Sequence, residues 1–121
     1  MSIKFLGFFA LLMYISSCSK ENTGNGGGGG GGTLDCSTVT NKAFTADVNP
    51  IIQSSCAVNS SCHGSGSING PGPLTSYTAI FNARVSVRSA VASGSMPKNS
   101  SLSTSQKNSI LCWIDSGAPN N

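Results

Sequence analysis

The chain has 121 residues, with 7 Lys or Arg against 4 Asp or Glu and a formal net charge of +3 at pH 7. The basic residues are scattered and form no cluster, which argues against nucleic acid or an acidic membrane surface as the partner. The length suits a single small domain, whose hydrophobic core is expected to need cross-links or a large apolar cofactor.

Residues 1–17 have the order of a secretory signal peptide. Lys4 precedes an apolar run over residues 5–15, which is too short for a membrane-spanning helix of roughly 20 residues. The segment Ile15-Ser16-Ser17-Cys18 resembles the lipobox of bacterial lipoproteins. The resemblance implies that Cys18 receives a lipid anchor in the membrane and begins the mature protein. The expected location is the bacterial cell envelope, as an outer-membrane lipoprotein that faces the periplasm or the cell surface.

The next segment, residues 18–34, is polar and then almost pure glycine, with glycine at every position from Gly26 to Gly32. Such a composition cannot bury apolar surface, and it predicts a flexible tether. A coil of about 16 such residues has a root-mean-square reach of roughly 20–24 Å, enough to hold a small domain off a membrane. Residues 35–121 are then expected to form the folded domain.

Helical patterns begin soon after the tether. Thr45 is a candidate N-cap ahead of Asp47 and Pro50, and the helix is expected to run to about Cys56. A short second helix is expected over residues 74–81. Its N-cap is either Thr75 or Ser76. Residues 83–92 fit a strand or a helix equally well, because the valines there suit both.

The last helix has the clearest signals. Ser103 and Gln106 form a capping box, Leu102 occupies the staple position, and Gly117 lies just past the end. These signals predict a helix over residues 104–116. The fold class is therefore predicted to be all-α, with the longest helices at the two ends of the domain.

Cys62-His63-Gly64, preceded by Cys56, indicates the chemistry of the site. In a c-type haem site two thiols add across the vinyl groups, and the histidine after the second thiol ligates the iron. The direct neighbourhood of Cys62 and His63 fixes the imidazole beneath the ring. Five residues, 57–61, separate the cysteines here, whereas two are usual. The pattern predicts one covalent haem c.

A second iron ligand is available from a loop. Without residues 1–17, the chain contains one histidine, His63, and one methionine, Met96. Methionine sulfur is a common ligand opposite histidine in a six-coordinate haem. Because Pro97 favours an extended conformation for the residue before it, Met96 is expected to present its sulfur from a loop and not from a helix.

Residues 44–120 resemble the class I cytochrome c fold, and more closely the small cytochrome-c-like domains of exported Bacteroidetes proteins. The resemblance rests on several motifs in the same order along the chain. They are the helix that ends at Cys56, Cys62-His63-Gly64, Gly70-Pro71-Gly72-Pro73-Leu74, Met96-Pro97 and Cys112-Trp113-Ile114-Asp115-Ser116-Gly117-Ala118-Pro119.

The resemblance implies a role for individual residues. His63 would be the proximal ligand of the iron and Met96 the distal ligand. Pro71 or Pro73 would offer a backbone carbonyl to the other nitrogen of His63, which fixes the orientation of the ring. Trp113 would pack its ring near the haem on the terminal helix.

The long gap between the cysteines leaves two arrangements of the thiols open. In the first, Cys56 and Cys62 both bind haem, residues 59–61 bulge outward, and Cys36 pairs with Cys112. In the second, only Cys62 binds haem, Cys56 pairs with Cys112, and Cys36 is left over. The even number of thiols favours the first arrangement, because that arrangement leaves no thiol without a partner.

The predicted function is electron transfer by a carrier and not catalysis by an enzyme. The mature chain has four carboxylic side chains, no obvious acid/base pair and no second histidine. The expected partner is a redox protein of the envelope, and the chain is expected to be a monomer. The alternative is a haem-free, disulfide-stapled binding or adhesion module of the envelope, because small exported domains often depend on disulfides.

Overall fold

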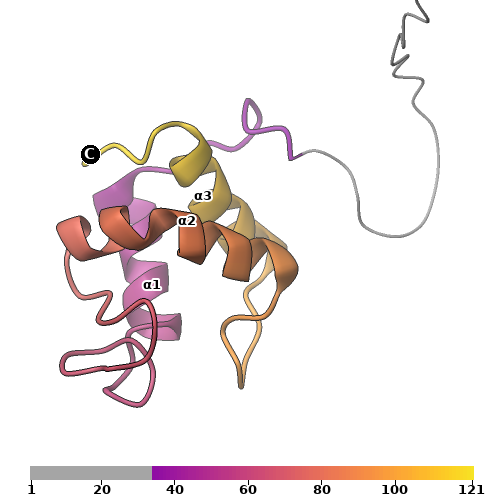
Figure 1. Ribbon diagram of the computed structural model, residues 1–121. Helices are drawn as coiled ribbons and strands as arrows, with labels where there is room; N and C mark the ends of the chain where they lie inside the picture. The colour runs from indigo at the N-terminus through magenta and orange to yellow at the C-terminus, as the bar shows by residue number, and fades with distance from the viewer. Residues whose placement is uncertain (1–33) are drawn as a thin grey trace, which may run out of the picture. The chain divides into compact units, whose positions relative to one another are not determined.

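The computed structural model describes residues 34–121, which fold into helices joined by loops (Figure 1). The elements are the π-helix η1 (Phe44–Val48), α1 (Asn49–Ser55), α2 (Tyr77–Ser93) and α3 (Thr104–Asp115). No strand occurs within residues 34–121, so the all-α prediction is confirmed for this part of the chain. None of its helices is long and apolar enough to cross a membrane. The predicted signal peptide, Cys18 and the polyglycine tether lie outside the described residues.

The first helical segment ends as predicted but begins differently. η1 leads directly into α1, which ends at Ser55. The predicted cap is wrong, because Thr45 lies inside η1 and the residue before the helix, Ala43, makes no side-chain cap. The backbone amides of Phe44 and Thr45 instead donate to the side-chain and main-chain oxygens of Asn121, both at 2.8 Å. A residue far along the chain therefore supplies the hydrogen-bond acceptors for the first amides of this helix.

The longest helix is α2, in the middle of the domain, and not one of the terminal helices as predicted. Ser76 is its N-cap, as one of the two expected candidates, and its Oγ accepts a hydrogen bond from the amide of Ala79 at 3.3 Å. The helix continues through residues 83–92. Ile80, Val87 and Val91 are buried, at spacings that place them on one helix face. Packing of this face outweighs the weak preference of valine for strands.

The capping box of α3 is confirmed. Ser103 Oγ accepts from the amide of Gln106 at 3.2 Å, and Gln106 Oε1 accepts from the amide of Ser103 at 2.9 Å. The helix ends at Asp115, one residue earlier than predicted. The side chain of Asp115 accepts two hydrogen bonds from Arg88 at 2.6 and 2.9 Å, which join α3 to α2 at the surface.

An aromatic cluster holds the helices together. Trp113 is fully buried, its ring lies 5.3 Å from the ring of Phe44, and its Nε1–H donates to the carbonyl of Pro119 at 2.8 Å. Tyr77 packs edge-on against Phe44 at 5.0 Å. These rings link η1, α2 and α3. The other buried apolar side chains are Val48, Ile52, Leu74, Ile80, Val87, Val91, Ile110, Leu111 and Ala118.

A disulfide joins Cys36, before η1, to Cys112 in α3. The Cα atoms of the two residues are 5.3 Å apart, within the usual range for a disulfide. This is the pairing of the first arrangement considered above. It leaves Cys56 and Cys62 as the free cysteines of the described chain.

Candidate cofactor site

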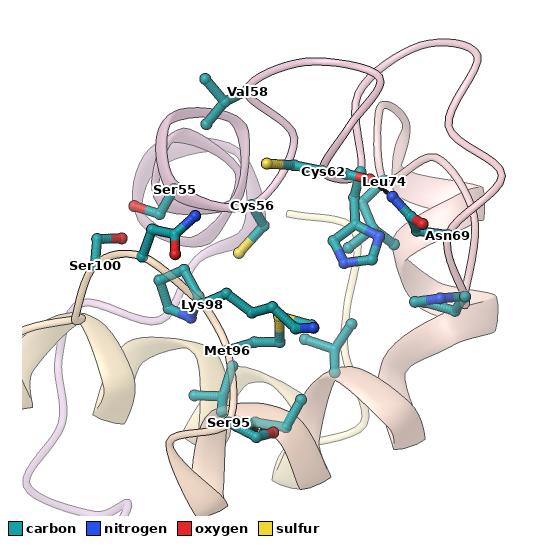
Figure 2. Close-up of a pocket in the computed structure, with 18 of the residues that line it drawn as sticks. Ser55, Cys56, Val58, Cys62, Asn69, Leu74, Ser95, Met96, Lys98 and Ser100 are labelled. Atoms are coloured by element: carbon teal, nitrogen blue, oxygen red, sulfur yellow. Dashed lines mark hydrogen bonds between the residues drawn. The ribbon is translucent and has the colours of Figure 1, made fainter.

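A cavity of about 840 Å³ opens beside the loop that follows α1, a volume within the range of about 300–1,000 Å³ for small-molecule and cofactor pockets. Its lining includes Cys56, Cys62, His63 and Met96, the four residues predicted to bind haem. Figure 2 shows Cys56 and Cys62 on one side of the cavity and Met96 on the other. The fold thus brings together residues that lie up to 40 positions apart in the sequence.

The cavity is poor in charge. Val87, Ala90 and Val91 of α2 line it together with Leu74, and all four side chains are apolar. Lys98 is the only Lys, Arg, Asp or Glu side chain in the lining. Eight Ser and Asn residues also line the cavity, but most of its surface is apolar, as is typical of cofactor sites.

His63 is nearly buried, with 8% of its surface exposed. Its Nδ1 lies 3.2 Å from the carbonyl oxygen of Gly72. A carbonyl can only accept a hydrogen bond, so this contact requires the hydrogen on Nδ1. The lone pair of Nε2 is then free to ligate a metal, in the manner of histidine ligands whose other nitrogen is held by a carbonyl.

The prediction that Pro71 or Pro73 accepts this hydrogen bond is wrong. The acceptor is Gly72, which lies between them. Gly72 has a φ of +97°, a left-handed conformation that favours glycine. Proline is fixed near −65° and cannot adopt it. The two prolines therefore flank the turn whose carbonyl holds the imidazole. Pro71 also lines the cavity, whereas Pro73 does not.

Met96 lies in the segment between α2 and α3, outside any helix, and is half-buried. Gly94 ends α2 in a left-handed conformation with a φ of +73°. The chain then folds back, and the amide of Met96 donates to the carbonyl of Ala90 at 3.4 Å. The last turn of α2 thereby holds the methionine beside the cavity, in the loop position that the sequence predicted.

Residues 57–61, between the two cysteines, fold into a compact loop around Asn59. The backbone carbonyl of Asn59 accepts from the amides of Cys62 at 3.1 Å and Gly64 at 2.8 Å. Its side-chain Oδ1 accepts from the amides of Ser61 at 2.9 Å and Cys62 at 3.2 Å. Both oxygens of this one residue therefore draw the chain into a tight turn.

The two ends of this loop meet. The amide of His63 donates to the carbonyl of Cys56 at 2.9 Å. In a helix, each amide bonds to the carbonyl four residues earlier, which is the separation of the histidine from the first cysteine in C-x-x-C-H. Here the separation is seven residues, and the same two groups are still bonded. The loop therefore holds three additional residues without losing the hydrogen bond between its two ends.

The backbone of Asn59 lies so close to residue 64 that there is no room for a side chain, which explains the glycine at this position. A Cβ at this position would lie 2.7 Å from the backbone of Asn59, nearer than real Cβ contacts come. Gly64→Ala is expected to lower the free energy of unfolding by about 1–3 kcal/mol, measured by urea denaturation. Gly70→Ala is the control, because a Cβ there would meet no atom within 4 Å. Equal stability losses in the two variants would contradict the interpretation that the contact with the Asn59 backbone requires glycine at position 64.

The two free thiols differ in environment. Cys62 is exposed and Cys56 is half-buried. Burial, and to a smaller extent the neighbouring Cys62, raises the pKa of the Cys56 thiol above its ordinary value. Cys56 is therefore a protonated thiol at neutral pH, and it is protected against the reactions of thiolates.

Trp113 was predicted to pack near the haem, but it does not line the cavity. It lies in the core against Phe44. Its indole N–H is satisfied by a main-chain carbonyl, as is typical of a buried tryptophan. Sequence reasoning also missed Asn59 and Gly72. Asparagine and glycine are characteristic turn residues, which is the signal that the sequence offered for both.

The donors of the cavity suit a haem better than a bare metal ion. In residues 34–121 no group of three or more His, Cys, Asp or Glu side chains is placed to hold a metal ion. A haem iron already has four ring nitrogens and needs only two axial ligands, such as one imidazole and one thioether. No family model matches the chain, and no curated protein or solved structure is significantly similar to it.

Proposed function

We propose that this domain binds one haem c covalently and transfers electrons in the cell envelope, in a fold of the cytochrome c type. The observation that carries the proposal is that a single apolar cavity is lined by Cys56, Cys62, His63 and Met96. Two thiols are available for the two vinyl groups of a haem. An imidazole and a thioether, the usual pair of axial ligands in an electron carrier, are available for its iron.

Each protein group has a defined task in this proposal. His63 is oriented by Gly72 and keeps the lone pair of Nε2 for the iron. Met96 offers its sulfur from the facing loop. The apolar side chains of α2 exclude water. They thereby limit the solvent reorganisation that accompanies a change in the charge of the iron. The bound haem supplies the one-electron redox couple. Electron transfer by such a carrier needs no acid/base pair.

The same proposal places the domain outside the cytoplasm. Residues 1–17 direct export, lipidated Cys18 anchors the monomeric chain in the outer membrane, and residues 18–34 tether the domain, facing the periplasm or the cell surface. The disulfide between Cys36 and Cys112 supports this location, because disulfides persist in oxidising compartments. The partner is a redox protein of the envelope that exchanges electrons with the haem.

The test is to express the chain together with a haem-attachment system and to denature the purified protein. Haem absorbance is expected to stay with the wild-type polypeptide. The Cys56→Ser/Cys62→Ser double variant is the control and is expected to lose it. Mass analysis of haem-linked peptides then reports whether one cysteine or both are attached.

A colourless wild-type protein would contradict the proposal. If such a protein carried a second disulfide by mass, between Cys56 and Cys62, the result would favour the alternative function, a disulfide-stapled binding or adhesion module of the envelope.

A further inference from the structure

The gap between Cys56 and Cys62 is three residues longer than in C-x-x-C-H, and one residue organises it. Asn59 accepts four hydrogen bonds, two through its carbonyl and two through Oδ1. Both oxygens bond to the amide of Cys62. The side chain of Asn59 thereby acts directly on the backbone of the second attachment cysteine.

The result of this turn is visible at the ends of the loop. The amide of His63 reaches the carbonyl of Cys56 although the two residues lie seven positions apart. Ser60 lies in the same loop, is exposed, and has no hydrogen bond from its hydroxyl group within the described chain. Within the loop, Asn59 thus makes most of the hydrogen bonds, and from outside it Asn69 Nδ2 donates to the carbonyl of Ser61 at 2.9 Å.

We propose that Asn59 is a positioning residue that lets a motif with a five-residue gap present both thiols to one haem. This inference rests on the proposed function. Each attachment adds a thiol S–H across a vinyl C=C: a C–S bond forms at one vinyl carbon and the hydrogen goes to the other. The addition consumes no oxidant or reductant, so its outcome depends on whether both sulfurs reach the two vinyl groups of the same ring.

The variants Asn59→Ala, Asn59→Asp and Ser60→Ala separate the role of the Oδ1 acceptor from that of the loop in general. Asn59→Ala removes Oδ1, Asn59→Asp retains an oxygen acceptor in the same place, and Ser60→Ala changes a neighbour that makes no such bond. Each full-length variant is coexpressed with the haem-attachment system. The ratio of doubly to singly attached haem is then measured from the masses of haem peptides.

Asn59→Ala is expected to lower this ratio about tenfold, which corresponds to about 1.4 kcal/mol. Its reduced absorption bands are expected to shift, because an unreacted vinyl group stays conjugated with the ring. Asn59→Asp and Ser60→Ala are expected to keep the wild-type ratio and bands. Rescue by Asp identifies the acceptor oxygen as the group that acts.

An unchanged ratio in Asn59→Ala would overturn the inference and leave the proposed function intact. A wild-type chain without covalent haem would overturn both. Far-UV circular dichroism of the variants is recorded in parallel. A loss of helicity in Asn59→Ala that matches the loss of double attachment would assign Asn59 to folding and would also overturn its positioning role.

Discussion

Replacement of Cys36 by serine is expected to lower the free energy of unfolding by about 4 kcal/mol. The disulfide to Cys112 spans a sequence separation of 76 residues, and a cross-link over so long a loop removes much of the entropy of the unfolded chain. Domains are stable by only about 5–15 kcal/mol, so the loss is a large fraction of the total. Denaturation by guanidinium chloride without reductant measures it.

Ser37→Ala is the matched control for this variant. Ser37 lies in the same turn and bonds only to the exposed side chain of Asp35, so its removal is expected to cost less than about 0.5 kcal/mol. Reduction of the wild-type disulfide is expected to reproduce the stability of Cys36→Ser. A stability of Cys36→Ser within 1 kcal/mol, roughly, of the wild type would show that the cross-link contributes little beyond the native packing.

Met96→Ala is expected to abolish the sulfur-to-iron charge-transfer band of the oxidised, haem-loaded protein. It is also expected to lower the reduction potential, because methionine ligation raises it. A decrease on the order of 100 mV is expected, within the about 0.8 V that axial ligands span. Absorption spectra and a redox titration measure the two effects.

Ser95→Ala serves as the control, because it alters the same loop and leaves the thioether in place. Its charge-transfer band and potential are expected to match those of the wild type. Persistence of the band in Met96→Ala would show that another group is the distal ligand, and the assignment of Met96 would then be wrong.

Local signals in the sequence were sufficient where the contacts themselves are local. The capping box of Ser103 and Gln106 lies within four residues, and α3 begins where it predicts. Ser76 likewise caps α2 through a residue three positions ahead. The site residues Cys62 and His63 are neighbours, and the signal for the loop position of Met96 was the adjacent Pro97, so these features could be predicted without knowledge of the fold.

Contacts between distant segments could not be read in this way. The side chain of Asn121 accepts the hydrogen bond of the first amide of η1 from 77 positions away, so the prediction of a local cap at Thr45 was wrong. The helical state of residues 83–92 depends on packing against the core, which their valines do not reveal. The carbonyl that holds His63 comes from Gly72 because of a backbone angle, and the loop closure by Asn59 depends on the turn it forms.

The bond between Cys36 and Cys112 also decides how the domain responds to mechanical load. Once the contacts of the C-terminal residues with the domain have broken, tension between these residues and the segment before Cys36 would pass through the sulfur bridge and bypass the chain between the two cysteines. About 250 Å of contour length, at roughly 3.4 Å per residue, would stay shielded. A domain pulled from its two ends would then extend outside the bridge, while the cavity residues, which all lie between Cys36 and Cys112, stay shielded.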